Sequence, residues 1–221
     1  MRVEVKEITP HNLFRECAEM TTGKPCKMSW ATALKNGHSL IRAQEWLIKL
    51  YDIPQMVAGH LVRHVHAQPY MLSKRADRGG EDFRTKCAEL TALMNDVVNE
   101  HGTVNFRIWD LVRKEVRDLP TTFDRYAPTS LALKVNAEEI INISHARLCT
   151  KASKETREVW QAVVDLIAEK DPDLAKHCVP KCIYRGGICG EPKSCKYYAS
   201  ESGKAALCEY KALFGNYVNK G

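Results

Sequence analysis

Three segments of the chain carry the hydrophobic pattern of β-strands. Residues 3–8 (VEVKEI) alternate apolar and charged positions, as expected of a strand with one buried face. Residues 45–53 (EWLIKLYDI) are rich in aromatic, aliphatic and β-branched side chains and stop at Pro54, which predicts a second strand. The apolar run LALKV, residues 131–135, predicts a third.

The residues after Pro54 predict a short helix, because the missing N–H of proline is not needed in the first helical turn. Val57, Leu61 and Val65 recur every fourth residue and would form one apolar stripe on that helix. The basic residues near its end would then lie on its other sides.

Longer helices are predicted further along the chain. Residues 82–102 place Phe83, Cys87, Leu90, Met94 and Val97 on one face before Gly102, a plausible stop, and residues 106–119 form an amphipathic helix that Pro120 ends. We expect both to be core elements with solvated charged faces. Residues 136–149 are also read as helical, with Cys149 packed in the core, and Ser153 can cap a helix that closes at Asp171-Pro172.

Composition places the chain among soluble globular proteins. It has 221 residues, of which 44% are hydrophobic and 27% charged, and no apolar run approaches the roughly 20 residues needed to cross a bilayer. The charged N-terminus lacks the apolar centre of a signal peptide, so we expect a cytoplasmic protein. The net charge of +6 favours anionic partners such as nucleotides, nucleic acid or acidic surfaces.

Residues 61–78 (LVRHVHAQPYMLSKRADR) form a basic stretch directly after the second predicted strand and its short helix. Arg63, Lys74 and Arg75 can neutralise phosphate oxygens, and Ser73 can add a neutral donor. An ordinary solvated basic face would look the same by composition, so both interpretations stay open.

From Cys178 onward the composition changes to Cys, Gly, Lys and Tyr, without any internal repeat or low-complexity segment. We therefore expect one domain, residues 1–175, with a Cys-rich extension, residues 176–221, packed on it. Four of the nine cysteines, Cys178, Cys182, Cys189 and Cys195, have three, six and five intervening residues. They could bind zinc or an iron–sulfur cluster, remain reduced thiols, or form disulfides.

The basic stretch resembles the signature of the flavin-dependent thymidylate synthases (ThyX), R-H-R-x-x-S-x-N-E-x-S-x-R. Arg63, His64, Ser73 and Arg75 match this signature. The departures around it are Val65, Gln68, Tyr70, Met71, Ala76, His60 and the pair Gln44-Glu45. Some members of the family also have a similar Cys-rich tail.

Two other segments extend the resemblance over roughly residues 36–157. Upstream, GHSLIRAQEWLIKLYDI resembles the family's G-H-x-S/T-x-x-E-H segment and keeps its histidine as His38. Downstream, residues 136–157 resemble N-x-R-S-x-x-N-F-x-x-L-R-x-x-x-x-A-Q-W-E-I-R, with Glu138 in place of the first Arg. The matching positions are Asn136, Asn142, Arg147, Ala152, Glu155 and Arg157. Arg125 occupies the place of another substrate-binding Arg.

The resemblance implies an α+β fold of helices and antiparallel sheet, assembled as a homotetramer that binds FAD between subunits. The flavin site would comprise His38, Ser39, Arg63, His64, Asn136 and Asn142. Ser73, Lys74, Arg75 and Arg125 would bind the deoxynucleotide, and Arg147 would lie against the pyrimidine edge as the catalytic cation. NADPH and methylenetetrahydrofolate would be co-substrates, and no catalytic cysteine is implied.

The implied reaction is one-carbon transfer to C5 of dUMP, which gives dTMP. The departures leave open a reaction on dCMP or a hydroxymethyl product, because the phosphate-binding cations match better than the groups around the base. A family member retained only for binding or assembly is another possibility. The rival from another class is a nucleic-acid-binding protein that uses the basic stretch for phosphates and the Cys-rich segment as a metal-held module.

Overall fold

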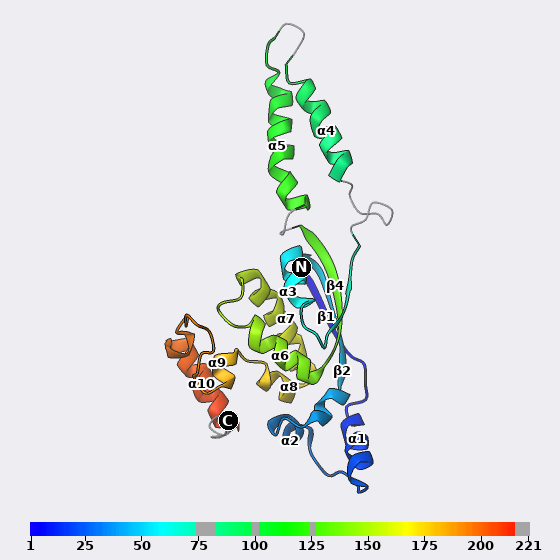
Figure 1. Cartoon of the computed structure of the whole chain (residues 1–221), viewed down its shortest axis with the longest axis vertical. Coiled ribbons are helices and arrows are strands. Elements are labelled where there is room, and N and C mark those ends of the chain that lie inside the picture. The colour runs from blue at the N-terminus through cyan, green and yellow to red at the C-terminus, as the bar shows by residue number, and fades with distance from the viewer. Residues whose placement is uncertain (74–82, 99–101, 124–126, 215–221) are drawn as a thin grey trace.

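The computed structural model describes residues 1–73, 83–98, 102–123 and 127–214 (Figure 1). Within them lies one antiparallel sheet with the strand order β1-β2-β4-β3. Its strands are β1 (Arg2–Glu7), β2 (Glu45–Pro54), β3 (Gln68–Met71) and β4 (Pro128–Asn136). The three predicted strands are confirmed. The edge strand β3 was not predicted, and all four of its residues are exposed.

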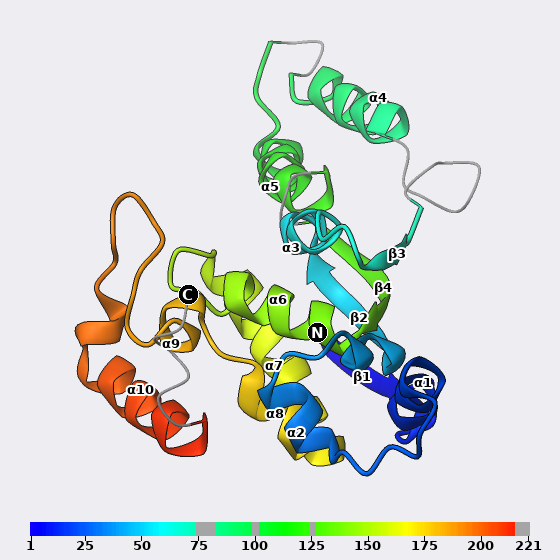
Figure 2. The same cartoon turned by 60° about the horizontal axis from the view of Figure 1, so that its bottom comes forward.

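One face of the sheet forms the core. Every second residue of the two central strands is buried there, as the two-residue period of a strand requires: Trp46, Ile48 and Leu50 in β2 and Leu131, Leu133 and Val135 in β4. The helices gather on this side of the sheet (Figures 1 and 2). They are α3 (Gln55–Leu61), α6 (Ala137–Arg147), α7 (Lys154–Lys170) and α8 (Pro172–His177). The mixed helix and antiparallel-sheet class is confirmed.

The long helix α7 begins and ends where the sequence indicates. The Ser153 side chain accepts a hydrogen bond from the Thr156 N–H at 3.3 Å and so caps the first turn. Trp160 is fully buried, and its Nε1 donates to Ser144 Oγ of α6 at 2.8 Å. The helix ends at Lys170, and Asp171 then caps α8 by accepting from the Leu174 N–H at 2.9 Å.

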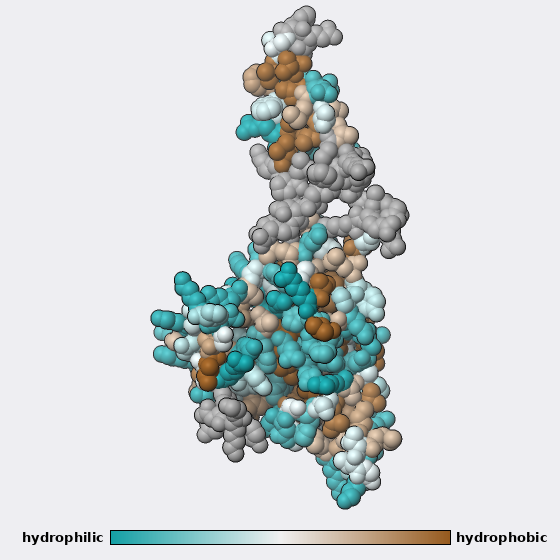
Figure 3. Space-filling model, in the orientation of Figure 1, coloured by the Kyte–Doolittle hydropathy of each residue, from teal (hydrophilic) through white to brown (hydrophobic). Residues whose placement is uncertain are grey.

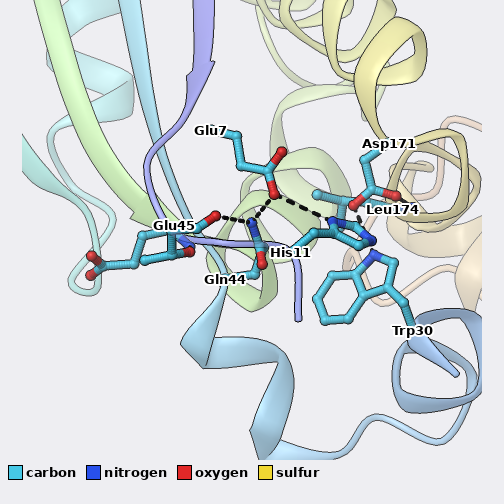
Figure 4. Close-up of polar contacts among 8 residues, drawn as sticks. Glu7, His11, Trp30, Gln44, Glu45, Asp171 and Leu174 are labelled. Carbon is cyan, nitrogen blue, oxygen red and sulfur yellow. Dashed lines mark hydrogen bonds and ion pairs between the residues drawn. The ribbon is translucent and has the colours of Figure 1, made fainter. Parts of the chain in front are cut away.

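The N-terminal part contains α1 (Leu13–Thr22), α2 (Trp30–Lys35) and η1 (Ser39–Ala43). Polar contacts fasten α2 and the end of η1 to the domain (Figure 4). Trp30 Nε1 donates to Asp171 Oδ2 at 2.7 Å, which joins α2 to the junction of α7 and α8. Gln44 is fully buried, and its Nε2 donates to Glu7 at the end of β1. These bonds fix the segment that leads into β2.

The predicted helix after Pro54 is shorter than expected. Pro54 precedes α3 as its N-cap residue, and α3 ends at Leu61. Val57 and Leu61 are fully buried, but Val65 is 89% exposed beyond the helix end. The predicted three-residue stripe is therefore wrong at its last position, and the basic residues after Leu61 lie in a turn that leads to β3.

The helices α4 (Phe83–Asn95) and α5 (Phe106–Phe123) project from the domain as a hairpin (Figure 1). Their prediction as core elements is wrong. Val97 and Val112 are buried, but seven large apolar side chains of its described residues are exposed: Met94, Val98, Val104, Phe106, Trp109, Leu111 and Val116. The hairpin accordingly shows brown, hydrophobic surface in Figure 3. Gly102 lies beyond the end of α4, and α5 continues through Pro120 rather than ending there.

The last elements are α9 (Lys181–Tyr184), η3 (Tyr197–Ala199) and α10 (Glu201–Phe214). Three buried residues, Cys182, Ile183 and Tyr210, form the small core between them. Gly203 is required there, because a Cβ at that position would lie 1.9 Å from the Tyr197 carbonyl oxygen. Within the described residues, no helix is long and apolar enough to cross a membrane.

Candidate functional site

The site is organised around the helix that follows the central strand β4. Asn136 is the last residue of β4 and the N-cap of α6, and its Oδ1 accepts from the Glu139 N–H at 2.9 Å. The Ala137 N–H donates to the Gln44 carbonyl oxygen at 2.9 Å, which brings the start of β2 alongside. The two strands therefore set the position of the first turn of α6.

Arg147, at the end of α6, contacts α3 and the turn after it. Its Nε donates to His64 Nε2 at 3.0 Å, and its Nη2 donates to the His60 carbonyl oxygen at 2.6 Å. On the other side of the imidazole, His64 Nδ1 lies 3.3 Å from Glu139 Oε1. Arg147, His64 and Glu139 thus form one continuous chain of polar groups, and two of its three members are predicted site residues.

His64 is held in its neutral form. Burial lowers its pKa to about 4, and the neighbouring positive charge of Arg147 contributes to the same shift. Because Arg147 donates to Nε2, that nitrogen must be unprotonated, and the imidazole proton lies on Nδ1, the nitrogen that faces Glu139. The contact between His64 and Glu139 is therefore one between a neutral ring and a carboxyl group rather than an ion pair.

Two cations approach each other at this site. Burial lowers the pKa of Arg147, and the positive charge of Arg63 lowers it further. Arg63 itself is exposed in the turn after α3. Two guanidinium groups close enough to repel each other are stabilised by an anion, and Arg is the side chain best suited to bind phosphate or carboxylate oxygens. The pair favours an anionic ligand.

Glu139 is the member of the site that sequence reasoning missed. It is only 4% exposed, burial raises its pKa, and Asn142 Nδ2 donates to its Oε2 at 3.5 Å. In the sequence it is the second of two acidic residues at a predicted helix start, where a negative charge is ordinary. One signal was available in the sequence: Glu139 lies in the segment that resembles ThyX, at a position where the family has Ser.

The predicted flavin residues His38 and Ser39 are exposed at the start of η1. The end of η1 is joined to the first turn of α6, because Arg42 Nε and Nη2 donate to the Glu138 carboxylate at 2.5 and 3.2 Å. Glu138 replaces the family's Arg and so has a cationic partner from η1. The structure thus brings η1 to the same end of β4 as Asn136.

Ser73, the predicted phosphate residue that the structure describes, belongs to the opposite end of β4. Met71 of β3 pairs with Leu131, and the Leu72 N–H donates to the Ser130 carbonyl oxygen at 2.9 Å, so Ser73 follows near the start of β4. At ~3.3 Å per residue, Ser130 and Asn136 are about 20 Å apart along the strand. Lys74, Arg75 and Arg125 lie outside the described residues.

The cysteines do not group as their sequence order suggests. Cys178 is buried in the main core, its Sγ–H donates to the Leu174 carbonyl oxygen at 3.5 Å, and burial raises its pKa to about 12. Cys149, predicted to be packed in the core, is instead partly exposed and lines a cavity with Cys182, Cys189 and Cys195. Cys178 is thus separated from Cys182, Cys189 and Cys195, and Cys149 lines the cavity beside these three.

Comparison with known structures identifies the fold. No protein-family profile matches the chain, and no curated protein matches it significantly. Its structure is similar to that of the flavin-dependent thymidylate synthase ThyX from Helicobacter pylori complexed with FAD and dUMP, with a TM-score of 0.54 and 17% identity over 81% of this chain and 100% of that one. A second structure of Helicobacter pylori ThyX with FAD and dUMP has a TM-score of 0.51 and 16% identity, covering 80% and 99% of the two chains. The chain therefore has a ThyX-like fold.

Proposed function

We propose that this protein is a flavin-dependent enzyme that transfers a one-carbon unit to C5 of a deoxypyrimidine monophosphate. The principal reaction would convert dUMP to dTMP, with methylenetetrahydrofolate as the carbon donor. The observation that carries the proposal is Arg147, at the end of α6, fixed against neutral His64 and subject to the positive charge of Arg63. The similar Helicobacter pylori structures contain FAD and dUMP, which supports this assignment.

The chemistry requires a fixed cation. C5 of a pyrimidine is a weak nucleophile, and its reactivity rises when negative charge on the ring oxygen and nitrogen is stabilised. Arg147 is partly buried and held by hydrogen bonds to His64 and His60, so it needs no reorganisation to provide that stabilisation. A single preorganised donor of this kind contributes about 2.7–4 kcal/mol to lowering a barrier.

The residues around α6 fit a flavin nucleotide. Arg63 can bind its phosphate oxygens, and His64, Asn136, Asn142, His38 and Ser39 supply hydrogen-bonding groups from three segments that meet at this end of β4. Bound FAD would supply the hydride that reduces the transferred carbon, with NADPH as the source of electrons. The protein would act in the cytoplasm.

A complete site would require more than one subunit. The flavin residues and Ser73 belong to opposite ends of β4, about 20 Å apart at the usual rise of a strand. The exposed apolar face of the α4–α5 hairpin is suited to pack against another copy of the chain. We therefore propose a homotetramer in which residues 1–175 form the catalytic unit and residues 176–221 a packed extension.

The identity of the base is the least constrained part of the proposal. Gln68, Tyr70 and Met71, which depart from the ThyX signature, are all exposed on the edge strand β3. Gln68, Tyr70 and Met71 precede Ser73, the proposed phosphate-binding residue. Different side chains at these three positions would therefore alter the contacts with the base without changing the contacts with the phosphate. This favours dCMP as an alternative substrate, or a hydroxymethyl group as an alternative product.

Flavin binding tests the proposal before any turnover is measured. The purified protein, reconstituted with FAD, should show flavin absorbance that remains after gel filtration, and dUMP or dCMP should perturb that spectrum. Arg63→Gln should weaken FAD binding, whereas Arg15→Gln, at an exposed position of α1, should leave it unchanged. Failure to retain FAD, with or without either nucleotide, would refute the proposal.

A further inference from the structure

The cavity between the end of α6 and the Cys-rich extension has the character of a metal site. Its volume is about 350 Å³, and it is lined by four cysteines from two parts of the chain: Cys149, Cys182, Cys189 and Cys195. Cys149 belongs to the loop after α6, and the other three belong to the extension. The thiols are all free, and Thr150 Oγ1 donates to Cys195 Sγ at 2.8 Å, so the loop and the extension are in direct contact.

We infer that these four cysteines hold an iron–sulfur cluster. Four thiolates are the usual ligand set of such clusters. A tetrahedral zinc ion needs four ligand atoms at about 2.0–2.3 Å. Among the described residues, no three His, Cys, Asp or Glu side chains converge closely enough to hold a single ion, which argues against zinc. A cluster of several iron and sulfide atoms is wider than a single ion, so it can bind thiols that lie further apart. The volume of this cavity is more than ten times the roughly 30 Å³ that one water molecule occupies.

The lining of the cavity is suited to an anionic group. Four cations, Arg147, Lys151, Lys181 and Arg185, line it against a single carboxylate, Glu191. A cluster bound by four thiolates is net anionic, so this excess of positive charge would stabilise it. His145 also lines the cavity, and its Nε2 is buried with no hydrogen-bond partner among the described residues, which a bound group could provide.

The extension also needs a constraint that its own core does not supply. Cys182, Ile183 and Tyr210 are the buried residues of its hydrophobic cluster, with six partly buried apolar residues packed against them, and segments with so small a core are usually held by disulfides or metals. The cysteines of the cavity form no disulfide with one another, and a metal centre bound by them would supply such a constraint. Because Cys149 comes two residues after Arg147, the cluster would fasten the extension next to the catalytic cation.

The composition of the full-length protein tests this inference. Protein purified without oxygen from iron-replete cells should contain about two or four iron atoms per chain and a matching amount of acid-labile sulfide. Both are measured chemically and do not depend on flavin absorbance. Protein without sulfide, zinc at one atom per chain, or disulfides between these cysteines in freshly isolated protein would each overturn the inference.

Matched serine variants locate the ligands. Cys149→Ser and Cys195→Ser should lose most of the iron and sulfide, while Cys178→Ser in the main core and Cys208→Ser on exposed α10 should retain them. Loss of the cluster in Cys178→Ser but not in Cys149→Ser, with both variants folded by circular dichroism, would contradict the ligand set. The measurement requires neither nucleotide nor turnover, so its outcome is separate from that of the proposed activity.

Discussion

Arg147 Nε donates a hydrogen bond to His64 Nε2 at 3.0 Å, and this bond joins the end of α6 to the turn after α3. The two residues are separated by 83 positions in the sequence. Since the Arg147 Nη2 also donates to the His60 carbonyl oxygen, the guanidinium is fixed by one contact with α3 and one with the turn after it. A fixed and partly buried cation is the feature on which the proposed chemistry depends.

The protonation state of His64 is the first prediction. Its pKa should be near 4, and its proton should lie on Nδ1 at neutral pH, because burial and Arg147 both oppose a second proton. Nitrogen-15 NMR of the imidazole reports both properties. The unfolded chain binds this proton below about pH 6.5, so the contribution of His64 to stability is full above pH 6.5 and falls as the pH drops towards about 4. A His64 pKa near 6.5 in the folded protein would contradict the geometry.

Arg147→Lys should reduce turnover by about 10²–10³-fold, as expected when one preorganised donor is lost. A lysine ammonium lacks the planar fork that reaches both His64 and the His60 carbonyl oxygen. The matched control is Arg15→Lys, an exposed position on α1 whose Nε donates to the Met28 carbonyl oxygen. Steady-state kinetics at saturating nucleotide should separate the two variants, and equal activities would remove Arg147 from the catalytic role.

Hydrophobic periodicity predicted most of the fold, because burial on one face of a strand or helix leaves a direct mark in the sequence. It located β1, β2, β4 and α7. The same periodicity wrongly predicted that the α4–α5 hairpin lies in the core. An apolar helix face that is exposed in the single chain has the same sequence pattern as an apolar face that is buried. The edge strand β3 left no pattern because all its residues are exposed.

The candidate site was predicted in part through the resemblance to ThyX. His64 and Arg147 are in direct contact, and Asn136 caps the helix that carries Arg147. Glu139 was missed, because a buried carboxyl group at a helix start cannot be told from a solvated one by sequence. The separation of Cys178 from the other three cysteines of the predicted set depends on tertiary packing, which spacing along the chain does not encode.

Asp171→Ala should lower the free energy of unfolding by about 2–4 kcal/mol. The substitution removes the partner of the buried Trp30 Nε1 and the cap of α8 at the same time (Figure 4). Asp165→Ala on the exposed face of α7 is the control and should change stability by less than about 0.5 kcal/mol. Denaturant titration measures both, and similar values for the two variants would show that the Trp30 contact contributes little.

The apolar hairpin should mediate assembly. Leu111 is 52% exposed on α5, and Leu111→Glu should place a charge in the proposed subunit contact and reduce the molar mass measured by light scattering. FAD retention should fall with it, since the proposed site is shared between subunits. Met20→Glu, at a position 87% exposed on α1, should leave the mass unchanged. A wild-type protein that is monomeric at all concentrations would contradict the proposed tetramer.

The most direct test of the central claim is the mass of the nucleotide after incubation of the protein with FAD, NADPH and methylenetetrahydrofolate. With dUMP or dCMP as substrate, we expect the product to gain one methyl or hydroxymethyl group at C5 and to lose the C5 hydrogen. The Arg147→Lys variant should form this product about 10²–10³-fold more slowly. Unchanged dUMP and dCMP after incubation with protein that has bound FAD would contradict the account.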